Sequence, residues 1–100
     1  MQKEMFKITK GTVDNIRVEI VSGYIINYMG LNLGISKSFN HWKITEISTG
    51  AYIKTGLKRL KDAIPWLNDH EELLNKLPEI LNSERCQKMK QAIKDYRLPN

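Results

Sequence analysis

The chain has 100 residues, of which 41% are hydrophobic and 27% are charged, and it contains a single cysteine. This length supports one modest core, so we predict a single domain over residues 1–100 and exclude any large active-site architecture. The composition is typical of a folded protein, and the lone Cys86 excludes both an internal disulfide and a cysteine-based metal cluster.

The net charge of +5 is distributed unevenly along the chain. It is +1 over residues 1–19, +5 over 20–61, −5 over 62–84 and +4 over 85–100. We therefore expect separate basic and acidic parts, a property that bears on partners more than on fold. The chain has no apolar run long enough to span a bilayer and no apolar leader at its start, so we expect a cytoplasmic protein and no membrane partner.

The first half of the sequence alternates apolar and polar residues, which predicts β-strands. We expect strands over residues 5–9, 16–20 and 24–29, with a bend or bulge at Ser22-Gly23. A short strand over residues 31–35 follows and leads into a loop over 36–40.

The segment from His41 to Lys54 predicts a hairpin that turns at Thr49-Gly50, because glycine supplies the positive φ of a tight turn. A two-residue turn pairs Ile47 with Tyr52 and Thr45 with Lys54. The expected core side of this hairpin consists of Trp42, Ile44, Ala51 and Ile53. The expected outer side consists of His41, Lys43, Thr45, Tyr52 and Lys54.

From Leu57 onward the apolar spacing becomes helical, which predicts two or three helices over about residues 57–97. Thr55 is the expected N-cap of the first helix. Pro65 has no N–H to donate, so we expect a kink or a restart there.

The second helix is expected to be capped by Asn68 or Asp69 and to kink or break at Pro78. Asn82 or Ser83 is expected to cap the last helix. The apolar residues of the second helix expected to pack inward are Leu73, Leu74, Leu77, Ile80 and Leu81.

Together these elements predict an α+β domain. An antiparallel sheet of three to five strands, over about residues 4–55, is followed by two or three helices packed on one of its faces.

The sequence contains no glycine-rich phosphate loop, no Ser/His/Asp set in a recognisable context and no zinc-ligand spacing. We expect His41 and His70 to be solvated. Asp69, Glu71 and Glu72 are explained by the start of a helix, whose dipole favours acids, without invoking a metal. We therefore predict a protein that is not an enzyme and needs no cofactor or metal.

The basic residues of the hairpin and of the first helix are the main functional signal. Lysines can contact phosphates and a tyrosine ring can stack on a base, while a helix N-terminus near Thr55-Gly56 offers free N–H groups to an anion. The same charges would also serve as the wet surface of any small domain. The candidate residues for binding nucleic acid or another partner are Lys43, Tyr52, Lys54, Lys58, Arg59 and Lys61.

The pattern Trp42-x-Ile44-Thr45-x-x-x-Thr49-Gly50-x-x-Ile53, followed by Gly56 and a basic helix start, resembles a strand-hairpin-helix motif of small, mostly uncharacterised proteins of phages and conjugative elements. The resemblance covers about a quarter of the chain. These proteins often carry His where Glu46 stands and Thr where Leu57 stands. The resemblance implies a mobile-element protein working in the cytoplasm of a bacterial host.

Two functions follow as hypotheses. The first is a non-enzymatic accessory that binds nucleic acid through the basic sheet face and the first helix. The alternative is an inhibitor of a host defence enzyme, of the anti-CRISPR or anti-restriction type, that acts by protein–protein contact through complementary charge. The partner is accordingly a nucleic acid or a host protein that processes nucleic acid.

Overall fold

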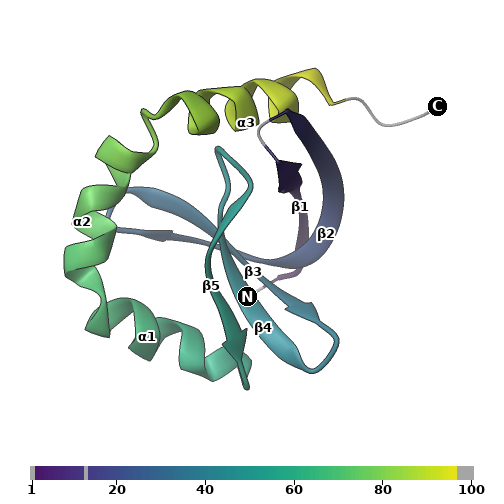
Figure 1. Ribbon diagram of the computed structural model, residues 1–100. Helices are drawn as coiled ribbons and strands as arrows, with labels where there is room; N and C mark the ends of the chain where they lie inside the picture. The colour runs from purple at the N-terminus through teal and green to yellow at the C-terminus, as the bar shows by residue number, and fades with distance from the viewer. Residues whose placement is uncertain (1, 13, 97–100) are drawn as a thin grey trace.

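The computed structural model describes residues 2–12 and 14–96 and has the predicted α+β architecture (Figure 1). The strands are β1 (Glu4–Thr12), β2 (Asn15–Tyr28), β3 (Leu31–Ser38), β4 (His41–Glu46) and β5 (Ala51–Leu57). They are followed by a 3₁₀ turn, η1 (Leu60–Asp62), and by the helices α1 (Ala63–Asp69), α2 (Glu71–Ile80) and α3 (Glu84–Asp95). The strands form one antiparallel meander in the order β1-β2-β3-β4-β5. The expectation of a sheet followed by helices is therefore confirmed.

The sheet curls strongly, so that its two edges approach each other (Figure 1). The Thr9 N–H donates to the Gly50 carbonyl at 2.9 Å, which joins β1 to the turn between β4 and β5. Inside the curl, the ring of Phe6 lies on Gly34, where a Cβ would come within 2.6 Å of it. Glycine at position 34 thus lets the aromatic ring fill the narrow interior.

The helices cover the outer face of the curled sheet. The main core joins apolar side chains of β3, β4 and β5 to those of α1 and α2, while α3 crosses β1 and β2 (Figure 1). The buried members of this core are Leu33, Ile35, Ile44, Leu57, Ala63, Leu67, Leu74 and Leu77. The packing of the helices on one face follows from the alternation in the strands, which sends every second side chain to that face.

The β4–β5 hairpin differs from the sequence prediction in its turn and its register. Glu46 pairs with Ala51 and Thr45 with Tyr52, so the turn has four residues, 47–50, instead of two. Ile47 lies in the turn and is not paired with β5, and its N–H donates to the Asn32 carbonyl of β3 at 3.0 Å. The reason is the side chain of Glu46, whose carboxylate binds the turn, so that β4 ends two residues earlier than a turn at Thr49-Gly50 would require.

Two further strand predictions need correction. The pairing of β2 is continuous through Ser22-Gly23, where Gly23 pairs with Glu4 on one side and Ser36 on the other, so the strand has no bulge there. β3 continues to Ser38, so the residues expected to begin a loop at Ser36 belong to the strand.

The helical region starts later than predicted. Thr55 and Gly56 belong to β5, and Leu57 pairs with Trp42 and joins the core as a strand residue. A single apolar residue fits both periodicities, so the spacing alone could not distinguish strand from helix there. Pro65 lies in the first turn of α1, where its missing N–H costs nothing.

The capping predictions had mixed outcomes. Ser83 is confirmed, since its Oγ accepts from the Cys86 N–H at 3.2 Å. Asn68 and Asp69 are wrong, because both end α1 and the N-cap of α2 is His70, which makes no side-chain cap bond. α2 also continues across Pro78 to Ile80 and does not break.

Two residues of α2 that were expected to pack inward are exposed, namely Leu73 and Ile80. Leu74 and Leu77 are buried as predicted.

Among the described helices, none is long and apolar enough to cross a membrane. The predicted helical range ends at about residue 97, which lies outside the described residues.

Candidate functional site

The predicted basic residues do not form one surface. Lys43 and Tyr52 lie together, with the Lys43 Nζ 4.5 Å from the centroid of the Tyr52 ring and both side chains half-buried. Their strand positions explain this contact, because Tyr52 pairs with Thr45, two residues from Lys43 on the same face of β4. This face is the inside of the curled sheet.

Lys54 lies on the opposite face of the sheet. Register shifts on both sides of Ile44 place Lys54 opposite Ile44, which is fully buried under the helices. The Lys54 Nζ accordingly lies 5.9 Å from the centroid of the Trp66 ring on α1. The prediction that Lys54 shares the outer face with Lys43 is therefore wrong. The reason is a bulge, which changes the alternation.

Thr45 was also expected on a wet face, yet it is fully buried. Its hydroxyl oxygen has no hydrogen-bond partner among the described residues. The curl of the sheet encloses it, because it faces the interior that Phe6 fills.

The remaining three bases lie near η1, between the end of β5 and the start of α1. Lys58 and Lys61 are exposed, and Arg59 forms an ion pair with Asp62 at 3.1 Å. The helix N-terminus expected at Thr55-Gly56 does not exist, because these residues are in β5. We call Lys58, Arg59 and Lys61 the basic ridge.

Lys43 and Tyr52 line a groove that the sequence did not predict. It has a volume of about 420 Å³ and lies between the end of β1, the β4–β5 hairpin and the start of α3. We call this site the basic groove. Its lining residues are Thr9, Lys10, Gly11, Lys43, Ala51, Tyr52, Arg85 and Met89.

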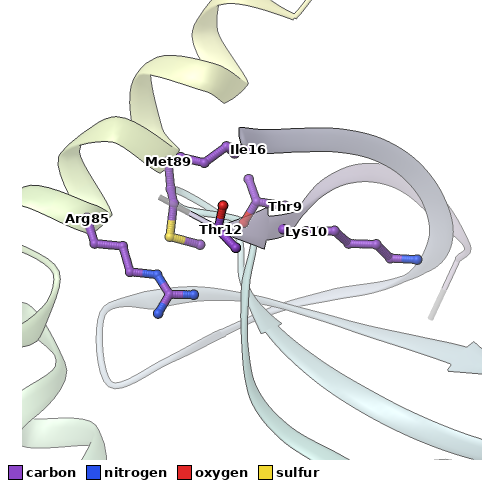
Figure 2. Close-up of a pocket in the computed structure, with 7 residues that line it drawn as sticks. Thr9, Lys10, Thr12, Ile16, Arg85 and Met89 are labelled. Carbon is purple, nitrogen blue, oxygen red and sulfur yellow. The ribbon is translucent and has the colours of Figure 1, made fainter. Parts of the chain in front are cut away.

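Helix α3 forms one wall of the basic groove. Figure 2 shows a smaller hollow that adjoins the basic groove, in which Met89 extends from α3 toward Thr12 on β1 and Arg85 extends from α3 beside Met89. Lys10 borders the same hollow, but its side chain points away from Arg85 (Figure 2). It pairs instead with Glu19 at 3.0 Å.

The charged side chains lining the basic groove are all basic. Neither Lys43 nor Arg85 takes part in an ion pair with another described residue, whereas Lys88, one turn along α3 from Arg85, approaches Glu84 at 3.7 Å. Two uncompensated cations beside an aromatic ring can hold a phosphate and stack a flat group. Sequence analysis missed Arg85, although the +4 charge of residues 85–100 was visible, because only the fold brings α3 to the hairpin.

Glu46 supports the wall of the basic groove that carries Tyr52. This carboxylate is only 3% exposed and accepts four hydrogen bonds from the turn. The Ser48 and Thr49 N–H groups donate to it at 3.0 Å each, and the Ser48 and Thr49 hydroxyls at 2.8 Å each. Gly50 follows with φ of 71°, and a Cβ there would lie 2.7 Å from the Thr9 nitrogen. The Thr49-Gly50 part of the hairpin motif therefore has a structural role.

A second hollow on the helix-covered face is almost entirely apolar. It has a volume of about 540 Å³ and lies where α1 leaves part of β2 and β3 uncovered. Its rim carries Lys61 and the partly exposed Ile64. The residues that line it are Ile26, Ile35, Leu60, Lys61, Ala63 and Ile64.

One tyrosine joins the sheet to the helices through polar contacts. The Tyr28 hydroxyl donates to the Glu71 carboxylate at 2.8 Å and also contacts the Asn68 side-chain oxygen. Desolvation, followed by the hydrogen bond and the charge of Glu71, raises the pKa of Tyr28 above its ordinary value of 10.0. Glu71 thus has a structural partner.

Among residues 2–12 and 14–96, His, Cys, Asp and Glu side chains form no group of three that could hold a metal ion.

Comparison with known proteins gave no match to a family model, a curated protein or a solved structure.

Proposed function

We propose that this protein is a small, non-enzymatic nucleic-acid-binding accessory that contacts phosphates through the basic groove. The resemblance of its hairpin motif to proteins of phages and conjugative elements suggests that it acts in the cytoplasm of a bacterial host. The basic groove replaces the larger surface predicted from the sequence. Lys43 and Tyr52 remain in the proposed site, and Arg85 joins them.

The observation that carries the proposal is the convergence of Lys43, Tyr52 and Arg85 on one groove without an acid among its lining residues. Lysines that only aid solubility extend into water, whereas Lys43 is half-buried against the Tyr52 ring. An anion entering the groove would meet two cations whose charge no described carboxylate compensates. Phosphate contacts of this kind supply most of the affinity of non-specific nucleic-acid binding.

The basic ridge is less suited to the same role. Arg59 is paired with Asp62, and Lys61 stands at the rim of an apolar hollow. Lys54 is directed to Trp66 on the helix side. Lys58 and Lys61 therefore offer a matched control for the charge of the basic groove.

The test compares two double reversals that lower the net charge equally. Lys43→Glu with Arg85→Glu should weaken binding to a labelled oligonucleotide at least about tenfold, because each contact to a charged group is worth roughly 1.5–3 kcal/mol. Lys58→Glu with Lys61→Glu should change the affinity much less. Fluorescence anisotropy at low salt measures both, and thermal melting verifies that each variant is folded.

Equal losses in the two double variants would contradict the proposal, because they would show that only net charge matters. Absence of binding by the folded wild-type protein at low salt would contradict it as well.

A second candidate function is protein–protein contact by an inhibitor, which the apolar hollow favours. Its lining fits an apolar side chain, and Lys61 at its rim fits an adjacent carboxylate of the partner protein. Pull-down from bacterial lysate with and without nuclease treatment tests this candidate, with Ile64→Asp as the comparison. A protein that is retained after nuclease treatment and released by Ile64→Asp would favour the inhibitor over the accessory.

A further inference from the structure

The tip of the β3–β4 hairpin holds an aromatic side chain in a strained and exposed position. Ser38 pairs with His41, so the turn consists of Phe39 and Asn40. Phe39 has φ of 54°, in the left-handed region that bulky residues rarely adopt, and its side chain is 91% exposed. The strained backbone of Phe39 therefore reduces the stability of the fold, and burial of the ring does not offset this loss.

The other hairpin tip provides a contrast within the same sheet. Met29 and Gly30 close the β2–β3 hairpin, and Met29 also has φ of 54°. The two tips thus share backbone strain at a residue other than glycine. They differ in the side chain, because Met29 is only 44% exposed and Phe39 is an almost fully exposed aromatic.

The β3–β4 tip lies at the end of the strand that carries Lys43. Lys43 pairs with Ser36, two positions along β4 from the Ser38–His41 pair that closes the hairpin. Tyr52 on β5 pairs with Thr45, two positions further along β4. Along β4, five residues separate Thr45 from Asn40, a distance of about 17 Å at roughly 3.4 Å per residue. Along the direction of β4, Tyr52 comes first, Lys43 second and Phe39 at the hairpin tip last.

We propose that Phe39 is a stacking platform for an unpaired base and that the ligand of the basic groove is therefore single-stranded nucleic acid. This inference rests on the proposed function. A strand held by its phosphates at Lys43 and Arg85 would extend along β4 and place a base on the exposed ring. In a duplex the base faces are already stacked on one another, so this contact is available only to a single strand.

The test uses Phe39→Gly, with Met29→Gly as its matched control. Glycine adopts positive φ without strain, so both variants should melt at or above the wild-type temperature. Phe39→Gly should nevertheless weaken binding to a labelled oligothymidine by about fivefold to a hundredfold, the usual worth of one stacked base. Met29→Gly should bind as the wild type does, and Phe39→Tyr should retain most of the affinity because its ring also stacks.

Binding of the same variants to a blunt duplex completes the experiment. The inference predicts weaker duplex binding by the wild type and no additional loss with Phe39→Gly. It is overturned if Phe39→Gly binds oligothymidine as tightly as the wild type, or if it loses duplex binding to the same extent.

The two proposals can fail separately. If reversal of Lys43 and Arg85 abolishes binding while Phe39→Gly has no effect, the stacking role is wrong and the groove stands. If Phe39→Gly instead abolishes capture of a protein from nuclease-treated lysate and leaves oligothymidine binding unchanged, the ring anchors a protein partner and the stacking role is overturned.

Discussion

The two faces of strand β4 differ in what covers them. On one face Ile44 is fully buried beneath the helices, with Trp42 packed at the edge of the same core. On the other face Lys43 and Thr45 point into the curl of the sheet, where Thr45 is enclosed and Lys43 reaches the Tyr52 ring at the basic groove. The second face is a partly enclosed interior that opens at a groove, and not the free wet surface that the alternation suggests.

This difference shows how closure of the sheet turns an apparently solvated strand face into the lining of a groove. The bond from the Thr9 N–H to the Gly50 carbonyl brings the edges together, and α3 then covers one side of the opening. On this face the Lys43 ammonium group is held against the Tyr52 ring. In the basic ridge, by contrast, Lys58 and Lys61 extend from an exposed turn.

The largest expected effect comes from placing a charge on the helix-covered face. Ile44→Asp should unfold the domain, because a buried unpaired carboxylate costs more than about 4 kcal/mol of a total stability of roughly 5–15 kcal/mol. Circular dichroism and thermal melting measure this. Lys43→Asp, one residue away on the other face, should fold. A cooperatively melting Ile44→Asp protein would mean that the two faces are assigned in reverse.

The next effect concerns the turn that closes the sheet. Glu46→Ala removes the acceptor of four hydrogen bonds and leaves the Ser48 and Thr49 N–H groups without it, so we expect a decrease of about 2–4 kcal/mol in the free energy of unfolding in urea. Glu46→Gln keeps the shape and one acceptor oxygen and should be less destabilised. Equal stability of Glu46→Ala and the wild type would show that the turn does not depend on this carboxylate.

A smaller effect, of opposite sign, is expected inside the curl. Thr45→Val replaces a buried hydroxyl that has no partner among the described residues with a methyl group of similar size. The stability should rise by about 1 kcal/mol, because the desolvation penalty of the hydroxyl disappears. Destabilisation in urea unfolding would instead indicate that the hydroxyl is satisfied.

The smallest effect is at the edge of the helix-covered face and depends on pH. The pKa of Tyr28 is higher in the folded state than its ordinary value of 10.0. The neutral hydroxyl therefore stabilises the fold fully below pH 10, and this stabilisation is lost as the pH rises through the folded-state pKa. Tyr28→Phe should be slightly less stable than the wild type at neutral pH. It should also lose less stability between neutral and strongly alkaline pH, as thermal melts across that range can determine. A parallel decline in both proteins would exclude this contribution.

The sequence was sufficient to predict the architecture wherever local pattern decides. Alternation in the first half indicated the sheet, Ile44 was correctly assigned to the core, and Ser83 was one of the two residues expected to cap the last helix. These features depend on neighbours within a few positions, which a single sequence displays.

The candidate site could be predicted only in part, because it depends on register and on distant contacts. Two register shifts next to Ile44 reverse the side on which Lys54 lies, and no composition rule marks such a bulge. Arg85 reaches the basic groove only because β1 meets the β4–β5 turn at Gly50 and because α3 crosses β1. The contribution of Glu46 was hidden because a carboxylate in a strand pattern is usually solvated.

The most direct test of the basic groove as the phosphate site is the dependence of affinity on salt. For single-stranded oligonucleotide, Lys43→Ala with Arg85→Ala should flatten the slope of log affinity against log salt by roughly 1.4, because each phosphate that is no longer neutralised reduces it by roughly 0.7. Lys58→Ala with Lys61→Ala should leave the slope at the wild-type value. Equal flattening in both double variants, or an unchanged slope when Lys43 and Arg85 are removed, would contradict the assignment.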